Sequence, residues 1–203
     1  MKRIFLLPLI FLAWLPVHGQ DSELPRKETV YSFEPHYLIN RGIRVDIGKP
    51  FGVRNMIQIC PQFYLSERDD DNFWQDRNQY SYLIGGGMNV YNKLFAFSNY
   101  MDYGLYLSYG VGYQFFYLEY TDYSDESEFS ASGTIHKIGA DLILGYQFFI
   151  HEIVSVDIYT GLGTRYSLMD ADGADTNRFN TAYFGYNYTG NLLLLGVRIG
   201  VVI

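Results

Sequence analysis

Strict alternation of apolar and polar residues recurs along most of this chain. Between Leu105 and Phe115, every odd position carries a large apolar or aromatic side chain, whereas the even positions carry Tyr, Ser, Gly, Gly and Gln. The same two-residue period runs through 138–148 and 154–166, there with the apolar residues mostly at even positions. Because successive side chains of a β-strand point to opposite faces, alternation held this long predicts strands with two chemically different faces.

Turn and loop signals divide the alternating pattern into eight predicted strands. These strands cover residues 28–37, 40–48, 55–66, 79–91, 103–119, 134–149, 153–167 and 190–203. The connections at 49–54, 92–102 and 150–152 are short or moderate, whereas those at 67–78, 120–133 and 168–189 are longer, polar and acidic. This arrangement indicates a wall of strands with one elaborated end.

The two faces of the predicted strands differ in a way that indicates the class of fold. One face is rich in glycine, which suits the crowded interior of a narrow barrel and gives a solvated face no benefit: Gly85, Gly87, Gly110, Gly112, Gly139, Gly145, Gly161, Gly163, Gly196 and Gly200. The other face is aliphatic in mid-strand and aromatic towards the strand ends, at Tyr82, Tyr91, Tyr113, Phe115, Tyr117, Tyr146, Phe148 and Tyr166. An apolar band with aromatic girdles is typical of a lipid-facing surface. We therefore predict an all-β fold, an eight-stranded antiparallel transmembrane β-barrel, with a soluble β-sandwich or lipocalin-like barrel as the alternative.

The glycine-rich face also carries a few ions of both signs, at Arg44, Asp46, Asp141, Asp157, Arg165 and Arg198. An unpaired buried charge is costly, and an eight-stranded barrel is just wide enough to be filled by side chains. We therefore predict an ion-pair network in the lumen, with a narrow conducting pore as the alternative. In the final segment LLLLGVRIGVVI, Arg198 is expected to point inward and pair with Asp141 or Asp157, and its replacement by leucine is expected barely to alter insertion.

The first 19 residues have the three-part form of a secretory signal. Lys2 and Arg3 precede an apolar run from Ile4 to Leu15, which is shorter than the roughly 20 residues a membrane-spanning helix needs. We predict a signal peptide over residues 1–19, Sec export, and a barrel domain over 20–203. Loss of the two cations takes the net charge from −7 to −9, which argues against nucleic acid as a partner.

The whole predicted mature chain resembles the small eight-stranded outer-membrane barrels, the OmpA/OmpX-like class. The first hairpin, Arg41-Gly42-Ile43-Arg44-Val45-Asp46-Ile47-Gly48, together with a signal followed by Gln20, is similar to the Bacteroidota version of these barrels. The last strand resembles their assembly signal, although it ends in Ile203 where an aromatic residue is usual. The resemblance implies localisation in the outer membrane, contact with lipid and lipopolysaccharide, and insertion by the barrel-assembly machinery. It implies no particular activity.

No catalytic, metal-binding or cofactor-binding constellation is evident, and none is expected. The histidines after the signal are His36, His136 and His151, and none precedes a serine by two residues, unlike the His-x-Ser-Asn motif of lipid A deacylase barrels. A pair of Ser132 and His136 is the remaining enzymatic alternative. The aspartates at 170, 172 and 175 do not fit the spacing of an EF-hand, which leaves weak divalent-cation binding by the acidic loops open.

The leading hypothesis is a non-enzymatic outer-membrane barrel that acts through its acidic extracellular loops. Surface interaction, envelope integrity and membership of a larger outer-membrane complex all remain open. The alternatives are a lipid-modifying enzyme and a narrow pore.

Overall fold

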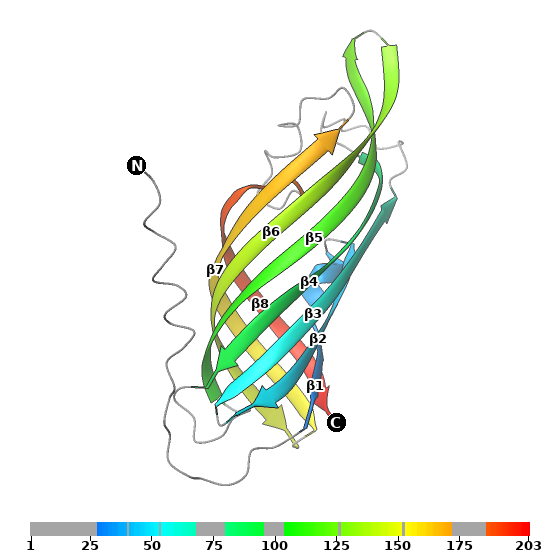
Figure 1. The fold of residues 1–203 in the computed structure, drawn as a ribbon. Coiled ribbons are helices and arrows are strands. Elements are labelled where there is room, and N and C mark those ends of the chain that lie inside the picture. Colours follow the sequence, from blue (N-terminus) through cyan, green and yellow to red (C-terminus); the bar gives the residue numbers. More distant parts are fainter. Residues whose placement is uncertain are drawn as a thin grey trace, which may run out of the picture.

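The computed structural model describes residues 28–39, 41–52, 54–67, 80–95, 104–125, 127–151, 153–171 and 186–203, with the backbone alone described at residues 80, 121–125 and 127–129. Eight antiparallel strands close into one barrel in sequence order, and β8 returns to pair with β1 (Figure 1). The strands are β1 (Val30–Phe33), β2 (Gly42–Phe51), β3 (Asn55–Glu67), β4 (Tyr80–Leu94), β5 (Gly104–Asp125), β6 (Ser127–Ile150), β7 (Val154–Ala171) and β8 (Gly190–Val202). The predicted eight-stranded antiparallel β-barrel is confirmed.

The first strand is much shorter than predicted. Residues 28–37 were expected to form it, but β1 ends at Phe33 and a 3-10 helix, η2 (Pro35–Leu38), follows. Proline has no N–H to donate to a strand ladder and is well suited to the first turn of a helix, so Pro35 ends the strand. Among the residues that the structure describes, no helix has the length and apolar character needed to cross a membrane.

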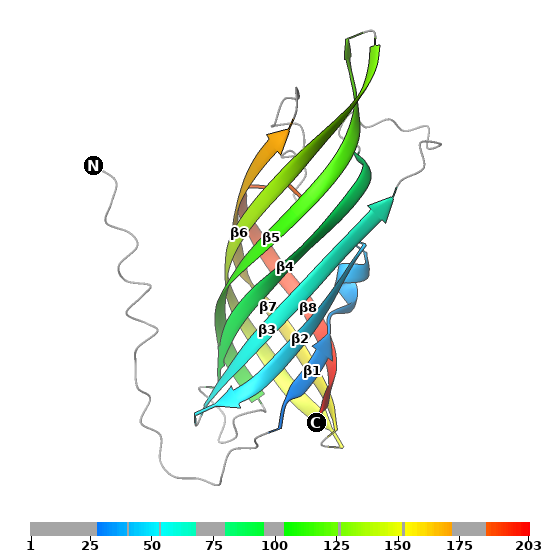
Figure 2. The ribbon, with the colours of Figure 1, turned by 45° about the vertical axis from the view of Figure 1, so that its right-hand side comes forward.

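The β5–β6 hairpin is much longer than predicted. Residues 120–133 were expected to form a polar loop, but β5 runs to Asp125 and β6 begins at Ser127, with pairing that reaches Asp122↔Phe129 before a register irregularity. Both ribbon views show this hairpin rising beyond the ends of the other strands (Figures 1 and 2). A two-stranded ribbon with both faces in water needs no apolar face, so its sequence shows no apolar–polar alternation. The polar, acidic sequence of 120–133 was therefore interpreted as a loop.

Side chains alternate between the interior and the outer surface as the sequence period predicts. On β8, Arg198 is 2% exposed, whereas its neighbours Val197 and Ile199 are 41% and 50% exposed. One predicted outward residue is wrong: Tyr91 is only 3% exposed and lies inside. Tyr91 shares its parity with Gly85 and Gly87 on β4, so the period itself should have placed its ring in the lumen.

Inward glycines lie directly opposite inward aromatic rings on neighbouring strands. The cross-strand partners are Gly42↔Tyr64, Gly85↔Phe116, Tyr91↔Gly110, Tyr106↔Gly145 and Tyr159↔Gly196. A Cβ atom added at any of these glycines would overlap the partner's ring. The glycine-rich face is therefore the space that five large rings need in order to lie flat against the inner wall.

We expect Gly145→Ala to lower the free energy of unfolding by about 1–3 kcal/mol, because the new methyl group overlaps the buried ring of Tyr106. Urea unfolding in detergent micelles or lipid vesicles would measure this change. The matched control is Gly86→Ala on the outer face, where the nearest atom to an added Cβ is the Gln62 carbonyl oxygen at 3.5 Å. Equal effects of the two substitutions would contradict the role of inward glycines as ring sites.

Candidate functional site in the barrel interior

Arg198 lies at the centre of a buried charge network. Its Nε is 2.8 Å from Asp46 Oδ2 and its Nη1 is 2.9 Å from Asp157 Oδ2, while the Glu34 carboxylate lies 3.7 Å from Nε. The guanidinium also stacks over Tyr159, with Cζ 4.1 Å from the ring centroid. Arg198 thus joins acidic residues from three different parts of the wall. This geometry argues against the expectation that leucine could replace Arg198 with little effect.

Two further cations complete this network on either side of Arg198. Arg44 donates from Nε to Asp46 Oδ1 at 2.6 Å, and its Nη1 lies 3.0 Å from Glu34 Oε2. Lys93 donates to Asp157 Oδ2 at 2.6 Å and to Gln147 Oε1 at 3.0 Å. Within the network each carboxylate therefore has at least one close cation, which offsets the cost of taking it out of water.

Asp141 and Arg165 form a separate unit nearer the loop end of the barrel. The Arg165 guanidinium binds both carboxylate oxygens of Asp141, with a distance of 3.2 Å from Nη2 to Oδ2. The Tyr91 hydroxyl donates to Asp141 Oδ2 at 2.7 Å. All six predicted lumen residues therefore point inward, but Arg198 contacts Asp157 and Asp46, whereas the contacts of Asp141 are with Arg165 and Tyr91.

Among the described residues, three charged interior side chains were not predicted: Glu34, Lys93 and Lys137. Lys93 and Lys137 lie at odd positions, as do the other inward residues of β4 and β6. The alternation therefore indicated that both side chains point inward. The predicted fourth strand ended at residue 91, which left Lys93 outside it. Glu34 lies within the predicted first strand, two positions from Ser32 and four from the buried Val30, so the alternation carried a signal for it too, although β1 itself ends at Phe33.

Glu34 also closes the barrel beside β1, whose ladders with β2 and β8 are the shortest of the barrel. β1 pairs with β8 over four residues, from Val30↔Val202 to Phe33↔Ile199, although β8 extends back to Gly190. Where β1 ends, the chain turns into η2 and no longer pairs with β8. Figure 2 shows η2 beside the upper part of β2. The Glu34 carboxylate accepts a hydrogen bond from the Tyr159 hydroxyl of β7 and pairs with Arg44 of β2. Side-chain interactions thus close a seam where the backbone ladder stops.

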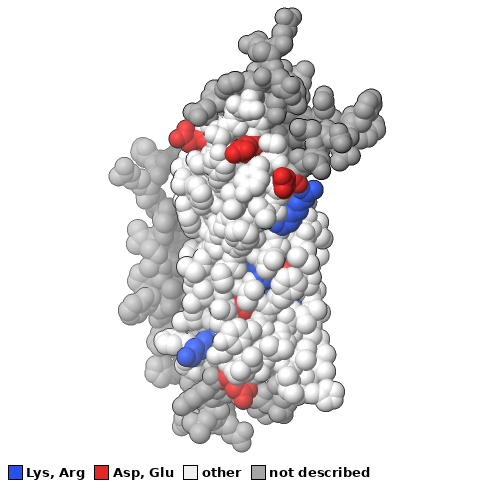
Figure 3. Space-filling view, turned by 90° about the vertical axis from the view of Figure 1, so that its right-hand side faces the viewer, with Lys and Arg blue, Asp and Glu red and all other residues white. Residues whose placement is uncertain are grey.

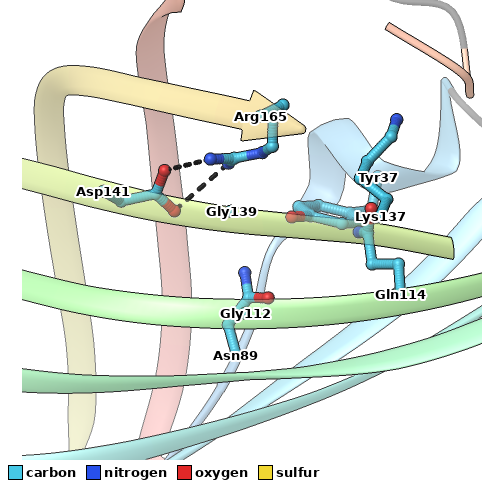
Figure 4. A pocket seen from close by; sticks show the side chains of 8 residues that line it. All are labelled: Tyr37, Asn89, Gly112, Gln114, Lys137, Gly139, Asp141 and Arg165. Atoms are coloured by element: carbon cyan, nitrogen blue, oxygen red, sulfur yellow. Dashed lines mark hydrogen bonds and ion pairs between the residues drawn. The ribbon is translucent and has the colours of Figure 1, made fainter. Parts of the chain in front are cut away.

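A small pocket lies beside the Asp141–Arg165 unit. It is lined by Tyr37, Asn89, Gly112, Gln114, Lys137, Gly139, Asp141 and Arg165, with an empty volume of about 270 Å³ that includes open space at its mouth. Figure 4 shows the Arg165–Asp141 pair at one end and the side chains of Tyr37, Lys137 and Gln114 gathered at the other. Above it, the rings of Tyr64, Phe116 and Tyr186 pack with centroids 4.9 to 6.1 Å apart.

Ser132 and His136 do not form the pair that the enzymatic alternative requires. Both residues lie on β6 and point to the same face of the strand. They are four residues apart, which corresponds to about 13 Å along a strand. His136 instead faces outward, where its Nδ1 is 2.7 Å from the Tyr113 hydroxyl and its ring is 5.1 Å from that of Phe115. Within the described part of the chain, no group of three or more His, Cys, Asp or Glu residues is placed to hold a metal ion.

Comparison with known proteins gives no family assignment, because no family model matches the chain. No curated protein matches it either. A major outer membrane protein from Thermus thermophilus aligns with a TM-score of 0.41 and 13% identity, covering 87% of this chain and 98% of that one. CarO of Acinetobacter baumannii aligns with a TM-score of 0.42 and 12% identity, covering 91% and 99%. At this level of likeness, the function of this chain has to be argued from its own residues.

We expect Asp157→Asn to lower the free energy of unfolding by about 3–5 kcal/mol, because Lys93 and Arg198 would then remain buried with one carboxylate fewer. Urea unfolding followed by circular dichroism would measure the change. Asp170→Asn is the matched control, since that carboxylate is exposed at the outer end of β7. A similar small change in both variants would show that the network contributes little to stability.

Proposed function

We propose that this chain is a non-enzymatic integral outer-membrane protein that acts through its external loops and the β5–β6 hairpin. The observation that carries the membrane location is a charge-free band around the barrel. Outward-facing charged residues lie at Lys49 near one end and at Glu67, Glu119 and Asp170 near the other. Between these levels, the described outward positions of all eight strands carry no Asp, Glu, Lys or Arg.

The band has the height and composition that lipid contact requires. On β3 it spans residues 57–65, close to the 9–11 residues of a transmembrane strand. Figure 3 shows a mostly white mid-section between charged residues at two levels, with small patches of charge showing through. Large aliphatic side chains such as Leu162, Leu193 and Leu195 are 65%, 64% and 73% exposed. A soluble barrel would expose this continuous apolar surface to water, which favours the membrane alternative.

We further propose that the resemblance to OmpA/OmpX-like barrels of Bacteroidota extends to the biology of the chain. It would be exported by the Sec route with residues 1–19 as its signal and inserted by the barrel-assembly machinery. It would then contact outer-membrane lipid and lipopolysaccharide, either alone or within a larger complex. The apolar, outward-facing column of β8, which reaches Ile203, supports this route because such machinery inserts strands with a lipid-compatible face.

The interior supports a structural role for the lumen over conduction or catalysis. The network around Arg198 fills the barrel with paired side chains, and Tyr106, Phe95 and Lys93 are almost fully buried beside it. The three acids and three bases of this network match in charge and lie close to one another, which supports a filled lumen. The separation of Ser132 from His136 removes the arrangement that favoured a lipid-modifying enzyme.

Complementation of a gene deletion tests the proposed role of the hairpin. A variant with residues 121–132 replaced by a two-residue turn is expected to insert and to keep the heat-dependent gel shift of a folded barrel, because β5 and β6 remain paired below it. It should nevertheless fail to restore resistance of the envelope to detergent. Lipid A should have the same mass spectrum in all strains. Full complementation by the shortened variant, or a changed acyl pattern in the deletion strain, would contradict the proposal.

We expect Val197→Arg to cost about 2–4 kcal/mol of folding free energy in lipid vesicles, because it places a charge on the lipid-facing column of β8. The measurement is reversible folding into vesicles, monitored by the gel shift. Lys49→Arg is the control, since this position already holds a cation at one edge of the band. Equal folding of both variants would refute the membrane face.

A further inference from the structure

Two residues on the outer surface of the barrel depart from the pattern of the charge-free band. Gly86 of β4 is the only glycine at the outward positions of the described strands, although many inward positions hold one. His136 of β6 is the only histidine at those outward positions, and its side chain is exposed. Both residues pair across the sheet with Phe115 of β5, which lies between them. The two exceptions therefore lie in one cross-strand row, within about 10 Å of each other.

Gly86 leaves an open space on the outer wall between two phenylalanines. Its cross-strand partners are Phe63 of β3, which is 50% exposed, and Phe115, which is 38% exposed. Apart from its chain neighbours, the one described atom within 4 Å of a Cβ added at Gly86 is the Gln62 carbonyl oxygen, at 3.5 Å. Neither ring therefore covers the glycine. A glycine inside a strand weakens it and often marks a place where a ligand approaches the backbone closely, so this notch is suited to an acyl chain.

Tyr113 binds one nitrogen of the His136 imidazole and leaves the other available. The Tyr113 hydroxyl is 2.7 Å from Nδ1, and the Phe115 ring packs against the imidazole with the centroids 5.1 Å apart. No residue that the structure describes is hydrogen-bonded to Nε2. Nε2 donates or accepts according to the direction of the bond at Nδ1. A hydroxyl group both donates and accepts, so it can pair with Nε2 in either case.

The charges nearest to His136 on the outer surface are negative. Asp170 of β7 lies two residues beyond Leu168, the cross-strand partner of His136, which corresponds to a diagonal separation of about 7–8 Å. Glu119 of β5 is exposed farther towards the hairpin. The described outward positions of β4 to β7 hold no Lys or Arg. Carboxylates repel a phosphate group but accept hydrogen bonds from hydroxyl groups, which favours an uncharged headgroup rich in hydroxyls.

The tilt of the strands sets the notch deeper in the band than the histidine. Figure 1 shows β4, β5 and β6 rising towards the hairpin, with β6 above β4 where they lie side by side. A row that crosses these strands at right angles therefore descends from β6 to β4, and so from His136 to Gly86. A lipid of the outer leaflet has the same order, with its headgroup at the edge of the band and its chains below.

We propose that Gly86, Phe115 and His136 form a binding site for one glycolipid of the outer leaflet. An acyl chain lies in the notch between Phe63 and Phe115, and a hydroxyl group of the sugar pairs with Nε2 of His136. Asp170 accepts hydrogen bonds from further hydroxyl groups at the edge of the band. This site rests on the proposed outer-membrane location and names the class of lipid that the barrel binds there.

The retention of two lipids tests the proposal. The purified mature barrel, in a zwitterionic detergent that carries no sugar, is mixed with glucosyl diacylglycerol or with phosphatidylglycerol that has the same acyl chains. Native mass spectrometry measures the fraction of barrel that keeps each lipid. The glycolipid is expected to be retained about fivefold more strongly, which corresponds to one net hydrogen bond. Equal retention of the two lipids, or a preference for phosphatidylglycerol, would overturn the proposal.

Two variants assign the binding to this row. His136→Phe keeps a ring but removes the polar nitrogens, and it should lower retention of the glycolipid about fivefold. Thr164→Val is its control, since it removes a polar group from an outward position of β7. Gly86→Leu fills the notch and should also lower retention, whereas Ala140→Leu adds bulk to an outward position of β6 and should not. Parental retention in the folded His136→Phe and Gly86→Leu variants would overturn the assignment.

Folding into phosphatidylcholine vesicles, read by the heat-dependent gel shift, separates failure of the site from failure of the membrane location. A parent chain that does not fold into vesicles would contradict the location, and the site with it. A parent chain that folds but shows no preference between the two lipids would contradict the site alone. If His136→Phe does not fold, Gly86→Leu with its control decides the assignment.

Discussion

The narrow lumen of the barrel limits which side chains can point inward. Eight strands enclose a space that side chains can fill completely, so every inward residue must both fit and satisfy its polar atoms. Arg198 offsets the cost of burying its charge by lying close to the carboxylates of Asp46, Asp157 and Glu34 at once. Because those acids come from β2, β7 and the β1–η2 junction, the same interactions that neutralise the charge also tie distant strands together.

Aromatic rings and glycines solve the packing side of the same problem. A ring such as Tyr106 or Tyr159 is too large for a narrow barrel unless the position opposite it has no side chain. The hydroxyl at the tip of such a ring then enters the charge network, as Tyr106 does by donating to Asp157 at 2.6 Å. Glycine, ring and carboxylate thus form one repeated arrangement in which loss of any member affects the other two.

The alternating period predicted the number of strands, their closure and the inward position of all six expected lumen ions, but not the ends of β1, β5 and β6. It limited the partner of Arg198 to Asp141 or Asp157 but could not choose between them, because Asp157 and Arg198 are 41 residues apart and meet only through the β7–β8 register. Glu34 was missed although it shares the even positions of the buried Val30 in the predicted first strand, because Pro35 interrupts the pattern directly after it. The β5–β6 hairpin was mistaken for a loop because a solvated ribbon lacks the apolar face from which strands are recognised.

Charge pairing also separates the interior into two regions. Around Arg198, three acids and three bases are matched, which offsets the cost of taking each charge out of water. Nearer the loop end, the Asp141 carboxylate of β6 binds Arg165 of β7 and accepts a hydrogen bond from Tyr91 of β4. Two separate sets of interior side chains therefore join strands of the barrel at two levels.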